Sequence, residues 1–547
     1  MAPRVITAEE AAGLVKSGDT VTVGGIVGTM LPEKVLAALE ARFLTEGAPR
    51  DLTWYDPSPT GAGPGYEHLS HEGMLKRVYE SWFPPLPELI ALIQQDKVEA
   101  YFIPLATGHL LLREIAAGSR GLLSRVGLHT MVDPRLGGGR LNNVTVEPLT
   151  EVVNVLGEER LLYPAFPIHV AIIRGSTADE AGNIALEEEP LTLGIFYQAM
   201  AAKRSGGTVI AQVKRLAQRG SLHPRQVVVP GMLVDYIVVD PQQKQNETFP
   251  DRYILSQDGA VRVPEPPAVV YPLTADKIAG RRAALELRPG MSLNVGAGIP
   301  GAALVPITRE EDIQDLLTIS VEHGCVAGAP GGVSGGGGWP LNPPFMLSYQ
   351  ELFDYYNGGG IDACFLAFGE LDREGNVNLL RFGGAFIGPG GSMDISQGPK
   401  KVVFCATFTA RGLQVRAGDG KLAIAQEGQS QRLVERVQDI CFSGRDMHRR
   451  GKEVLYVTER AVFKLGPSGP VLVEVAPGID VEREVLGQMG FRSAIAPDLK
   501  TMDQRLFRAD GMALRRELIG ESRDRPTVRG EPPGWAAVMR EPPKPSS

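Results

Sequence analysis

The chain has 547 residues, a formal net charge of −8, and 43% hydrophobic against 22% charged residues. A chain of this length is too long for a single hydrophobic core, so two or more domains are expected. The acidic balance argues against nucleic acid as the main partner. The sequence contains no apolar run near the ~18 residues that span a membrane, which argues against a membrane protein.

The four cysteines are few for this length and show no C-x-x-C spacing. Neither a disulfide framework nor a zinc site is therefore indicated, and a reducing compartment is expected. The N-terminus lacks the charged and then apolar pattern of a secretory signal peptide. These features together predict a cytoplasmic protein without a bound metal.

The order of elements predicted at the start of the chain occurs a second time later in the sequence. Thr7 precedes Glu10 by three residues, a capping-box spacing that predicts a helix to about residue 16. Residues 20–28 then read as a strand that enters a glycine turn, and Pro32 marks the start of another helix. A helix from Thr274, a strand from 292 and a glycine turn before Pro300 repeat this order. In both copies the glycines that precede and follow the strand are six residues apart, at 18 and 24 and at 290 and 296.

A second internal match supports a duplication. Residues 168–184 align with 361–377 at an offset of 193, and Asp179-x-x-Gly-Asn183 falls on Asp372-x-x-Gly-Asn376. Each of these short motifs joins two apolar runs, as a hairpin turn does. Two matches in the same order predict two domains of one fold.

The alternation of strands and helices predicts an α/β fold with mostly parallel strands in each domain. We place the domains at 1–240 and 273–515, with a linker at 241–272. Residues 521–547 contain six prolines, many charges and few apolar side chains, so they are interpreted as a disordered tail.

The most distinctive stretch is 317–338. The β-branched run 317–321 predicts a short buried strand with Glu322 at its carboxyl end, the edge where open α/β sheets bind their ligands. Seven glycines follow between 328 and 338, and such loops let backbone amides approach an anion. The residues alone leave two interpretations open: a carboxylate nucleophile or base beside an anion site, or a glutamate that caps a turn.

Several segments together resemble family I coenzyme A (CoA) transferases, and most closely their fused single-chain branch of acetate/propionate and 3-oxoacid enzymes. The segments that carry the resemblance are Ser-Val-Glu322-His-Gly, Gly388-Pro-Gly-Gly-Ser-Met-Asp394, and the runs at 353–362, 400–409 and 475–480. The resemblance covers roughly residues 1–515. It implies two tandem homologous open α/β domains with the active site at the interdomain interface.

The resemblance implies an acyl-CoA:carboxylate CoA-transferase with ping-pong kinetics on short-chain acyl groups. Glu322 would attack the acyl-CoA carbonyl, and CoA would then return to the glutamyl group as a thioester. A glutamate is normally ionised at neutral pH, so this nucleophile needs no general base. Gly391 matches the family's oxyanion glycine. The expected partners are acyl-CoA and a small carboxylate, CoA is a substrate and not a prosthetic group, and a homodimer or homotetramer is expected.

Further site residues follow from the resemblance and from the two glycine turns. Contacts to CoA are expected from Gly390, Asn294, Gly296, Gly298 and Lys401. The substrate pocket is expected to include Gly24, Gly25, Gly28, Leu105 and Glu370.

One of these positions departs from the family pattern. Leu105 stands where relatives carry a glutamine that donates to the oxyanion, so the acyl pocket is more apolar here or the reaction is altered. An acyl-CoA hydrolase and an acyl-CoA-binding paralogue without turnover therefore remain alternatives.

Two neighbours of Glu322 offer rival assignments. Cys325 could be the nucleophile, but a free cysteine is more often a small buried apolar residue. His323 could act as a base, but adjacent residues of a strand point to opposite faces, so we expect it to face away from Glu322.

Overall fold

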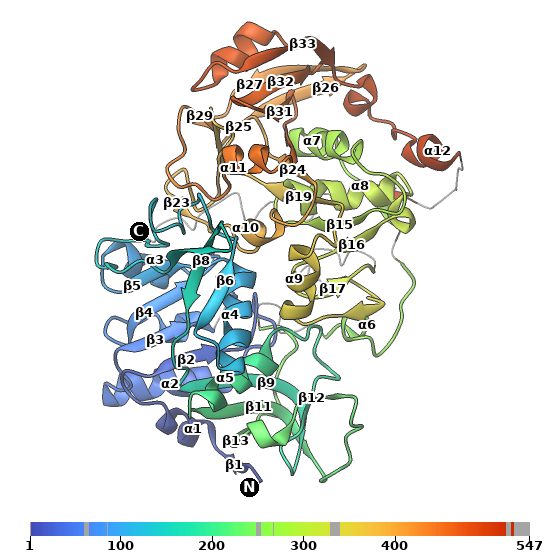
Figure 1. The fold of residues 1–547 in the computed structure, drawn as a ribbon. Helices are drawn as coiled ribbons and strands as arrows, with labels where there is room; N and C mark the ends of the chain where they lie inside the picture. The colour runs from blue at the N-terminus through green and yellow to red at the C-terminus, as the bar shows by residue number, and fades with distance from the viewer. Residues whose placement is uncertain are drawn as a thin grey trace.

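The computed structural model describes residues 2–58, 65–84, 86–247, 253–265, 267–328 and 340–520, and the backbone of 527–529. It consists of an N-terminal and a C-terminal half, each built around one ten-stranded sheet. In Figure 1 the N-terminal half runs from blue to green below, and the C-terminal half from yellow to red above. The expected α/β class is confirmed.

The N-terminal sheet has the order β1-β13-β11-β9-β2-β3-β4-β5, and these neighbours are all parallel. The short strands β10 and β12 pair at its side in antiparallel fashion. The strands are β1 (Arg4–Ile6), β2 (Thr20–Val23), β3 (Leu52–Tyr55), β4 (Leu75–Glu80), β5 (Glu99–Phe102), β9 (Val170–Asp179), β10 (Ile184–Ala185), β11 (Thr208–Ala217), β12 (Val227–Val229) and β13 (Tyr236–Val239). The main helices of this half are α1 (Ala8–Leu14), α2 (Glu33–Glu46), α3 (Pro87–Gln94), α4 (Leu105–Ala117) and α5 (Ile195–Arg204).

The C-terminal sheet has the order β18-β17-β16-β15-β19-β24-β30-β31-β32-β33, and its central strands from β16 to β30 are parallel. Its strands are β15 (Ser292–Val295), β16 (Thr318–Ser320), β17 (Cys325–Val326), β18 (Phe345–Met346), β19 (Ala363–Ala367), β24 (Lys401–Cys405), β30 (Glu453–Val457), β31 (Ala461–Gly466), β32 (Gly469–Val475) and β33 (Ala494–Thr501). Its helices include α7 (Ala275–Ala284), α8 (Val305–Glu310), α9 (Tyr349–Asn357), α10 (Ser392–Ile395), α11 (Gly444–Arg449) and α12 (Leu514–Ile519).

The duplication predicted from the sequence is visible in the strand register. Ile210 of β11 pairs with Ile172 of β9, and Val403 of β24 pairs with Phe365 of β19. Both members of the second pair lie 193 residues after those of the first. The strand order β13-β11-β9-β2-β3 of one sheet therefore corresponds to β30-β24-β19-β15-β16 of the other.

The two predicted hairpin turns are also built alike. In each, the aspartate accepts the amide N–H groups of the asparagine side chain, at 3.0 Å for Asn183 and 3.1 Å for Asn376. The asparagine oxygens accept the backbone N–H groups of Gly231 and Gly444. Such asparagine bridges replace backbone pairing at a turn, so both halves use the same device at equivalent places.

The capping box predicted at Thr7 is present, and the second repeat has a related cap. Thr7 and Glu10 form the reciprocal capping box of α1, and the side chain of Thr274 accepts the N–H of Lys277 at the start of α7. These bonds satisfy backbone donors that the first turn of a helix leaves free.

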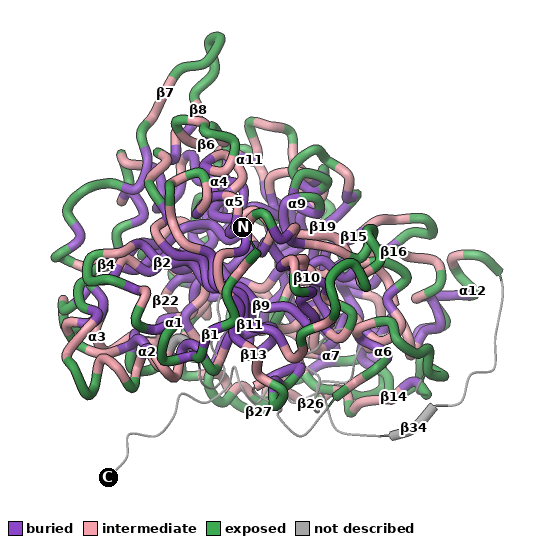
Figure 2. The backbone as a smooth tube through the Cα atoms, turned by 90° about the horizontal axis from the view of Figure 1, so that it is seen from below, coloured by how far each residue is buried: buried purple, intermediate pink, exposed green. Residues whose placement is uncertain are grey.

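One continuous apolar core joins the two halves. It includes Val23 and Leu105 of the N-terminal half together with Phe353, Met393 and Val402 of the C-terminal half. A second cluster fills the other face of the C-terminal sheet, beneath α7 and α8. In Figure 2 the buried segments accordingly gather towards the centre of the molecule.

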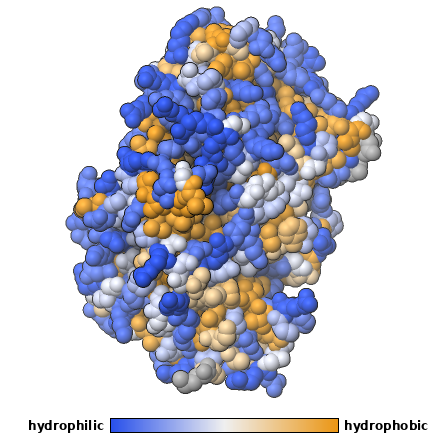
Figure 3. Space-filling model, viewed as in Figure 1, coloured by the Kyte–Doolittle hydropathy of each residue, from blue (hydrophilic) through white to orange (hydrophobic). Residues whose placement is uncertain are grey.

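The surface is different in character. On the face seen in Figure 3, hydrophilic side chains predominate and apolar ones form separate groups. A three-stranded sheet of β6 (Gly121–Ser124), β8 (Glu158–Pro164) and β7 (Glu151–Val155) carries a hairpin that projects from the body in Figure 2. Within the described ranges, no helix combines the length and the hydrophobicity that crossing a bilayer requires.

The structure describes most of the predicted linker and a short part of the predicted tail. Gln243 and Asn246, at the start of the linker, are buried against the N-terminal half. Within the linker, the structure shows α6 (Leu255–Asp258) and β14 (Ala268–Val270). The tail lies outside the described residues except for β34 (Thr527–Arg529), whose backbone pairs with β14.

Candidate active site

Glu322 lies in a tight turn at the carboxyl end of β16. The strand ends at Ser320, because the N–H of Val321 bonds to Cys325 O at 3.0 Å and turns the chain back into β17. The Glu322 side chain is 26% exposed. The acid thus stands at the expected edge of the sheet, although the strand is shorter than the predicted 317–321.

The Glu322 carboxylate sits in a notch made by Gly390 and Gly391. A Cβ atom on Gly391 would lie 3.1 Å from Glu322 Cδ. It would lie closer still to Oε2, at less than the 3.0 Å that Cβ atoms in real structures keep from other atoms. A Cβ on Gly390 would lie 3.9 Å from Oε1. Residue 391 must therefore lack a side chain if the carboxylate is to occupy this position.

The notch is held by backbone bonds from the N-terminal half. The N–H of Gly390 donates to Ser81 O at 2.9 Å, and the N–H of Phe83 donates to Ile387 O at 2.8 Å. The N–H of Leu105 approaches Gly390 O at 3.4 Å. Glu322 and its glycine notch therefore lie where the two halves meet, and in Figure 1 helix α10, which begins just after the notch, stands between them.

A second acid, Asp394, belongs to the same turn as the notch but was not predicted as a site residue. It is fully buried, and its oxygens accept the N–H groups of Ala106 and Thr107 and the hydroxyl of Thr107. Burial raises the pKa of Asp394, the bonds from Thr107 and Ala106 lower it, and the charge of Glu322 raises it again, to about 7. The motif that contains Asp394 was visible in the sequence, but its contact with a helix almost 290 residues away was not.

Two tyrosines of α9 lie beside Glu322. Burial raises the pKa of Tyr349 and Tyr356, and the Glu322 carboxylate adds to both increases. Tyr356 donates to Ser320 Oγ at 2.6 Å and accepts from the side chain of Asn294 at 3.1 Å. Asn294 is only 1% exposed. The Asn294 side chain supports Tyr356 beneath the site, and its contact with CoA stays a prediction.

Behind Tyr349 lies a buried polar group of the N-terminal half. The His109 ring stacks on Tyr349 with centroids 4.2 Å apart, and its Nε2 lies 2.5 Å from Ser58 Oγ. Burial lowers the pKa of His109 to about 3, so the ring is neutral. Burial also raises the pKa of Asp56 well above its usual range, with a further increase from Glu80. None of these residues stood out in the sequence.

The expected role of Lys401 in binding CoA is not supported by its position. Its ammonium group forms ion pairs with Glu286 and, at 3.7 Å, with Glu453. Lys401 alternates along β24 with Val402, so it shares a face with Val403, which packs in the second core cluster. Lys401 is thus an ion-pair partner of Glu286 in this structure, and its contact with CoA stays a prediction.

The glycine turns expected near the site shape the ends of adjacent strands. Gly296 follows β15, its N–H donates to Phe365 O at 2.9 Å, and Gly298 has φ +82°. Both glycines thus lie one strand away from Glu322, because β15 pairs with β16. Their contact with CoA stays a prediction.

In the N-terminal half, the turn after β2 contains Gly24, Gly25 and Gly28. Gly25 has φ +139° and packs against Leu31. Asn246 donates to Val27 O at 3.1 Å and so braces the turn from the linker side. The place of these glycines in a substrate pocket stays a prediction.

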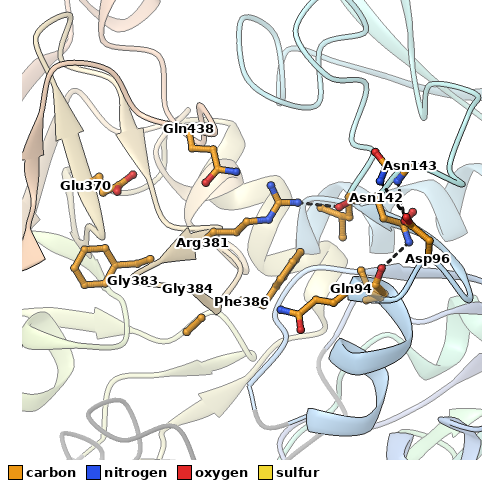
Figure 4. A pocket seen from close by; sticks show the side chains of 14 residues that line it. Gln94, Asp96, Asn142, Asn143, Glu370, Arg381, Gly383, Gly384, Phe386 and Gln438 are labelled. Atoms are coloured by element: carbon orange, nitrogen blue, oxygen red, sulfur yellow. Dashed lines mark hydrogen bonds between the residues drawn. The ribbon is translucent and has the colours of Figure 1, made fainter.

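A cavity of about 370 Å³ is lined by residues of both halves, but neither Glu322 nor the notch glycines are among them. Figure 4 shows Gln94, Asn142 and Asn143 of the N-terminal half across from Arg381 and Gln438 of the C-terminal half. Residues 383–386 of its wall lead along the chain directly into the glycines at 388–391. Two further residues were predicted in the pocket. Glu370 lines this cavity and accepts from Asn378 at 2.8 Å, while Leu105 is buried at the start of α4.

The rival nucleophile and base are both placed by the structure. Cys325 is 1% exposed, and burial raises the pKa of its thiol to about 12, which disfavours a thiolate. The prediction that His323 faces away from Glu322 is wrong: His323 Nε2 lies 3.5 Å from Glu322 Oε1. The two residues occupy a turn and not a strand, so their side chains do not alternate.

Of the predicted glycine-rich loop at 328–338, only Gly328 belongs to the described residues. In the part of the chain that the structure covers, no group of three or more histidine, cysteine, aspartate or glutamate side chains is arranged to hold a metal ion.

Comparison with known proteins places this geometry in a family. Residues 5–240 match the family model described as coenzyme A transferase. Caffeate CoA-transferase of Acetobacterium woodii is 39% identical over 513 residues, which are 92% of this chain and 97% of that protein. Acetate CoA-transferase YdiF of Escherichia coli K12 is 38% identical over 92% of this chain and 95% of its own.

The fold agrees with a solved relative. The acyl-CoA transferase YdiF of Escherichia coli O157:H7, in a crystal structure described as a thioester complex with CoA, superposes with a TM-score of 0.88 at 35% identity. The match covers 94% of this chain and 97% of that one. The chain therefore belongs to the coenzyme A transferase family, and it is an enzyme that transfers CoA.

Proposed function

We propose that the protein moves CoA between acyl groups and carboxylates through a thioester on Glu322. The observation that carries this proposal is the position of the Glu322 carboxylate, which is partly exposed, set against Gly391 and located where the two halves meet. A carboxylate in such a position can attack a carbonyl without a general base.

The reaction proceeds by two exchanges at Glu322. One Glu322 oxygen attacks the thioester carbonyl of acyl-CoA, the C–S bond breaks, and a mixed anhydride and CoA thiolate form. The thiolate then attacks the glutamyl carbonyl, forms the Glu322–CoA thioester and releases the donor acid with the bridging oxygen. A second carboxylate reverses these steps and leaves as its CoA ester. No net oxidation occurs, and neither ATP nor a metal enters the balance.

The other site residues are assigned by their positions. The backbone N–H of Gly391 is proposed to donate to the oxyanion that each attack creates, a contact typically worth about 2.7–4 kcal/mol. Tyr356, supported by Asn294, supplies a neutral polar neighbour to Glu322. The interdomain cavity, with Arg381 and several amide side chains, is proposed to take part of the acyl-CoA.

The relatives suggest two substrate classes. One is named for acetate and the other for caffeate, and we propose a small carboxylate such as acetate as one substrate. Leu105 places an apolar side chain where a hydrogen-bond donor was expected, so larger apolar carboxylic acids should also be tested as substrates. We further propose a cytoplasmic homo-oligomer, in line with the four free cysteines.

The proposal is tested by the mass of the protein after incubation with acyl-CoA alone. We expect a stoichiometric CoA adduct on the peptide that contains Glu322, removed by borohydride reduction and absent in Glu322→Gln. Cys325→Ser is the matched control three residues away, and it should form the adduct as the wild type does. An active enzyme that never carries the adduct would contradict the proposal.

The hydrolase alternative predicts a different balance. A hydrolase consumes acyl-CoA continuously without a carboxylate acceptor. A transferase without acceptor consumes only one acyl-CoA per active site and then remains as the Glu322–CoA thioester. Sustained release of free CoA in the absence of acceptor would therefore favour hydrolysis at the same glutamate.

A further inference from the structure

We propose that Asp394 is a positioning residue that ties the glycine notch of the C-terminal half to the first turn of α4 in the N-terminal half. The inference rests on the proposed function of Glu322, because it concerns the geometry in which that glutamate reacts. It assigns a role to a buried acid that the reaction itself does not use.

The first observation is that α4 takes its cap from the other half. Its own N-cap residue is Pro104, which makes no side-chain capping bond. Asp394 instead accepts the N–H of Ala106 at 3.2 Å and, through its other oxygen, the N–H of Thr107 at 3.0 Å and the Thr107 hydroxyl at 2.6 Å. A carboxylate at this end of a helix is favoured both by the free N–H groups and by the helix dipole.

The second observation is that Asp394 and the notch belong to one hydrogen-bonded turn. The N–H of Ile395 donates to Gly391 O at 2.9 Å, which closes the first turn of α10 between the notch and the capping acid. From the other side, the N–H of Leu105 reaches Gly390 O. A displacement of α4 is thereby transmitted to Gly390 and Gly391, against which the Glu322 carboxylate rests.

The third observation is the electrostatic interaction of two acids. Glu322 acts on Asp394 through its charge. The charge of Asp394 also acts on Tyr163, which is fully buried and donates to Val126 O. When Glu322 becomes a neutral thioester, one of two nearby negative charges is removed. Asp394 then holds its own charge more easily, and the cap on α4 is strongest in the covalent intermediate.

The test is the pH dependence of adduct formation with acyl-CoA, measured by rapid quench between pH 5.5 and 8.5. In the wild type we expect the rate to fall as the pH drops through about 7, because protonated Asp394 no longer accepts both N–H groups. We call this fall the acidic limb of the pH profile. Asp394→Asn should be at least tenfold slower at pH 8 and lack the acidic limb, while its KM for acyl-CoA changes by less than threefold.

Thr107 gives an independent readout in case Asp394→Asn does not fold. Thr107→Val removes a bond that lowers the pKa of Asp394, so its limb should move to higher pH. Thr107→Ser should restore the wild-type profile. Asp372→Asn, at another buried aspartate of the same half, should keep the limb at the wild-type pH.

Two results would overturn the inference. One is a rate of adduct formation in Asp394→Asn within threefold of the wild-type rate at pH 8, with the same acidic limb. The other is an acidic limb in Thr107→Val at the same pH as in the wild type. If the wild type forms no adduct at all, the proposed function fails instead. The cap would then be judged by the same variants from the pH profile of kcat.

Discussion

The substitution Gly391→Ala separates the stability of the fold from the position of the nucleophile. Gly391 has φ −81° and ψ −6°, a conformation that alanine adopts without strain. The added methyl group would meet only the end of the Glu322 side chain at an impossible distance, and Ile395 Cδ1 at 3.3 Å. A flexible carboxylate can move aside, so the fold is retained while Glu322 is displaced by roughly 1 Å, a misplacement that can cost about 100-fold in rate.

We therefore expect Gly391→Ala to lose about 100-fold in kcat/KM, close to ~2.7 kcal/mol of transition-state stabilisation. Its stability should be unchanged or up to ~1 kcal/mol higher, because alanine restricts the unfolded chain. Gly390→Ala is the matched comparison: its Cβ would clear Glu322, but its φ of +54° makes alanine strained. Gly390→Ala should therefore lose stability, but it should lose less activity than Gly391→Ala. Steady-state kinetics and thermal unfolding of both proteins provide the assay, and Gly391→Ala within threefold of the wild type would refute the reasoning.

Two further predictions concern stability. Burial lowers the pKa of His68, but bonds of 2.5 Å to Glu33 and to Glu40 outweigh it and raise that pKa to about 9. Its stabilising effect is thus complete below pH 6.5 and lost as the pH rises through 9, by about 2–3 kcal/mol. Thermal unfolding at pH 6.5 and 9.5 should show this loss in the wild type but not in His68→Gln, and equal losses in both would count against it. Asn183→Ala and Asn376→Ala, which break equivalent turn bonds, should each cost about 1–3 kcal/mol and add in the double variant. Denaturation of the three proteins measures this, and a cost in only one half would argue against equivalent turns.

The parts of the fold that could be predicted from sequence are those governed by local chemistry. The capping pair Thr7 and Glu10 and the two Asp-x-x-Gly-Asn turns carry their hydrogen-bond partners within a few residues. Their repetition was enough to predict two α/β domains of one fold. The position of Glu322 followed from the same logic, since a single acid after a β-branched run lies at a sheet edge.

The contacts that the sequence did not reveal are those that distant residues or an early strand end decide. Lys401 precedes an apolar strand, and only the fold shows that Glu286, 115 residues earlier, pairs with it. Asn294 lies near the site, but its side chain is taken by Tyr356. His323 was misplaced because the strand ends at Ser320, where a bond between Val321 and Cys325 starts a turn.

Asp394 illustrates the same limit. The segment from Gly388 to Asp394 was recognisable as one motif, yet the helix that Asp394 caps begins almost 290 residues earlier in the chain. Long-range capping of this kind leaves no local pattern. It becomes visible only when the two halves are seen together.

The most direct test of the account follows the oxygen atoms of the acceptor. In a single turnover of the Glu322–CoA enzyme with a carboxylate labelled with ¹⁸O in both oxygens, the acceptor attacks the glutamyl thioester and leaves one labelled oxygen on Glu322. We expect the peptide containing Glu322 to gain about 2 Da while the acceptor leaves as its CoA ester. Formation of that CoA ester with an unlabelled Glu322 peptide would contradict it.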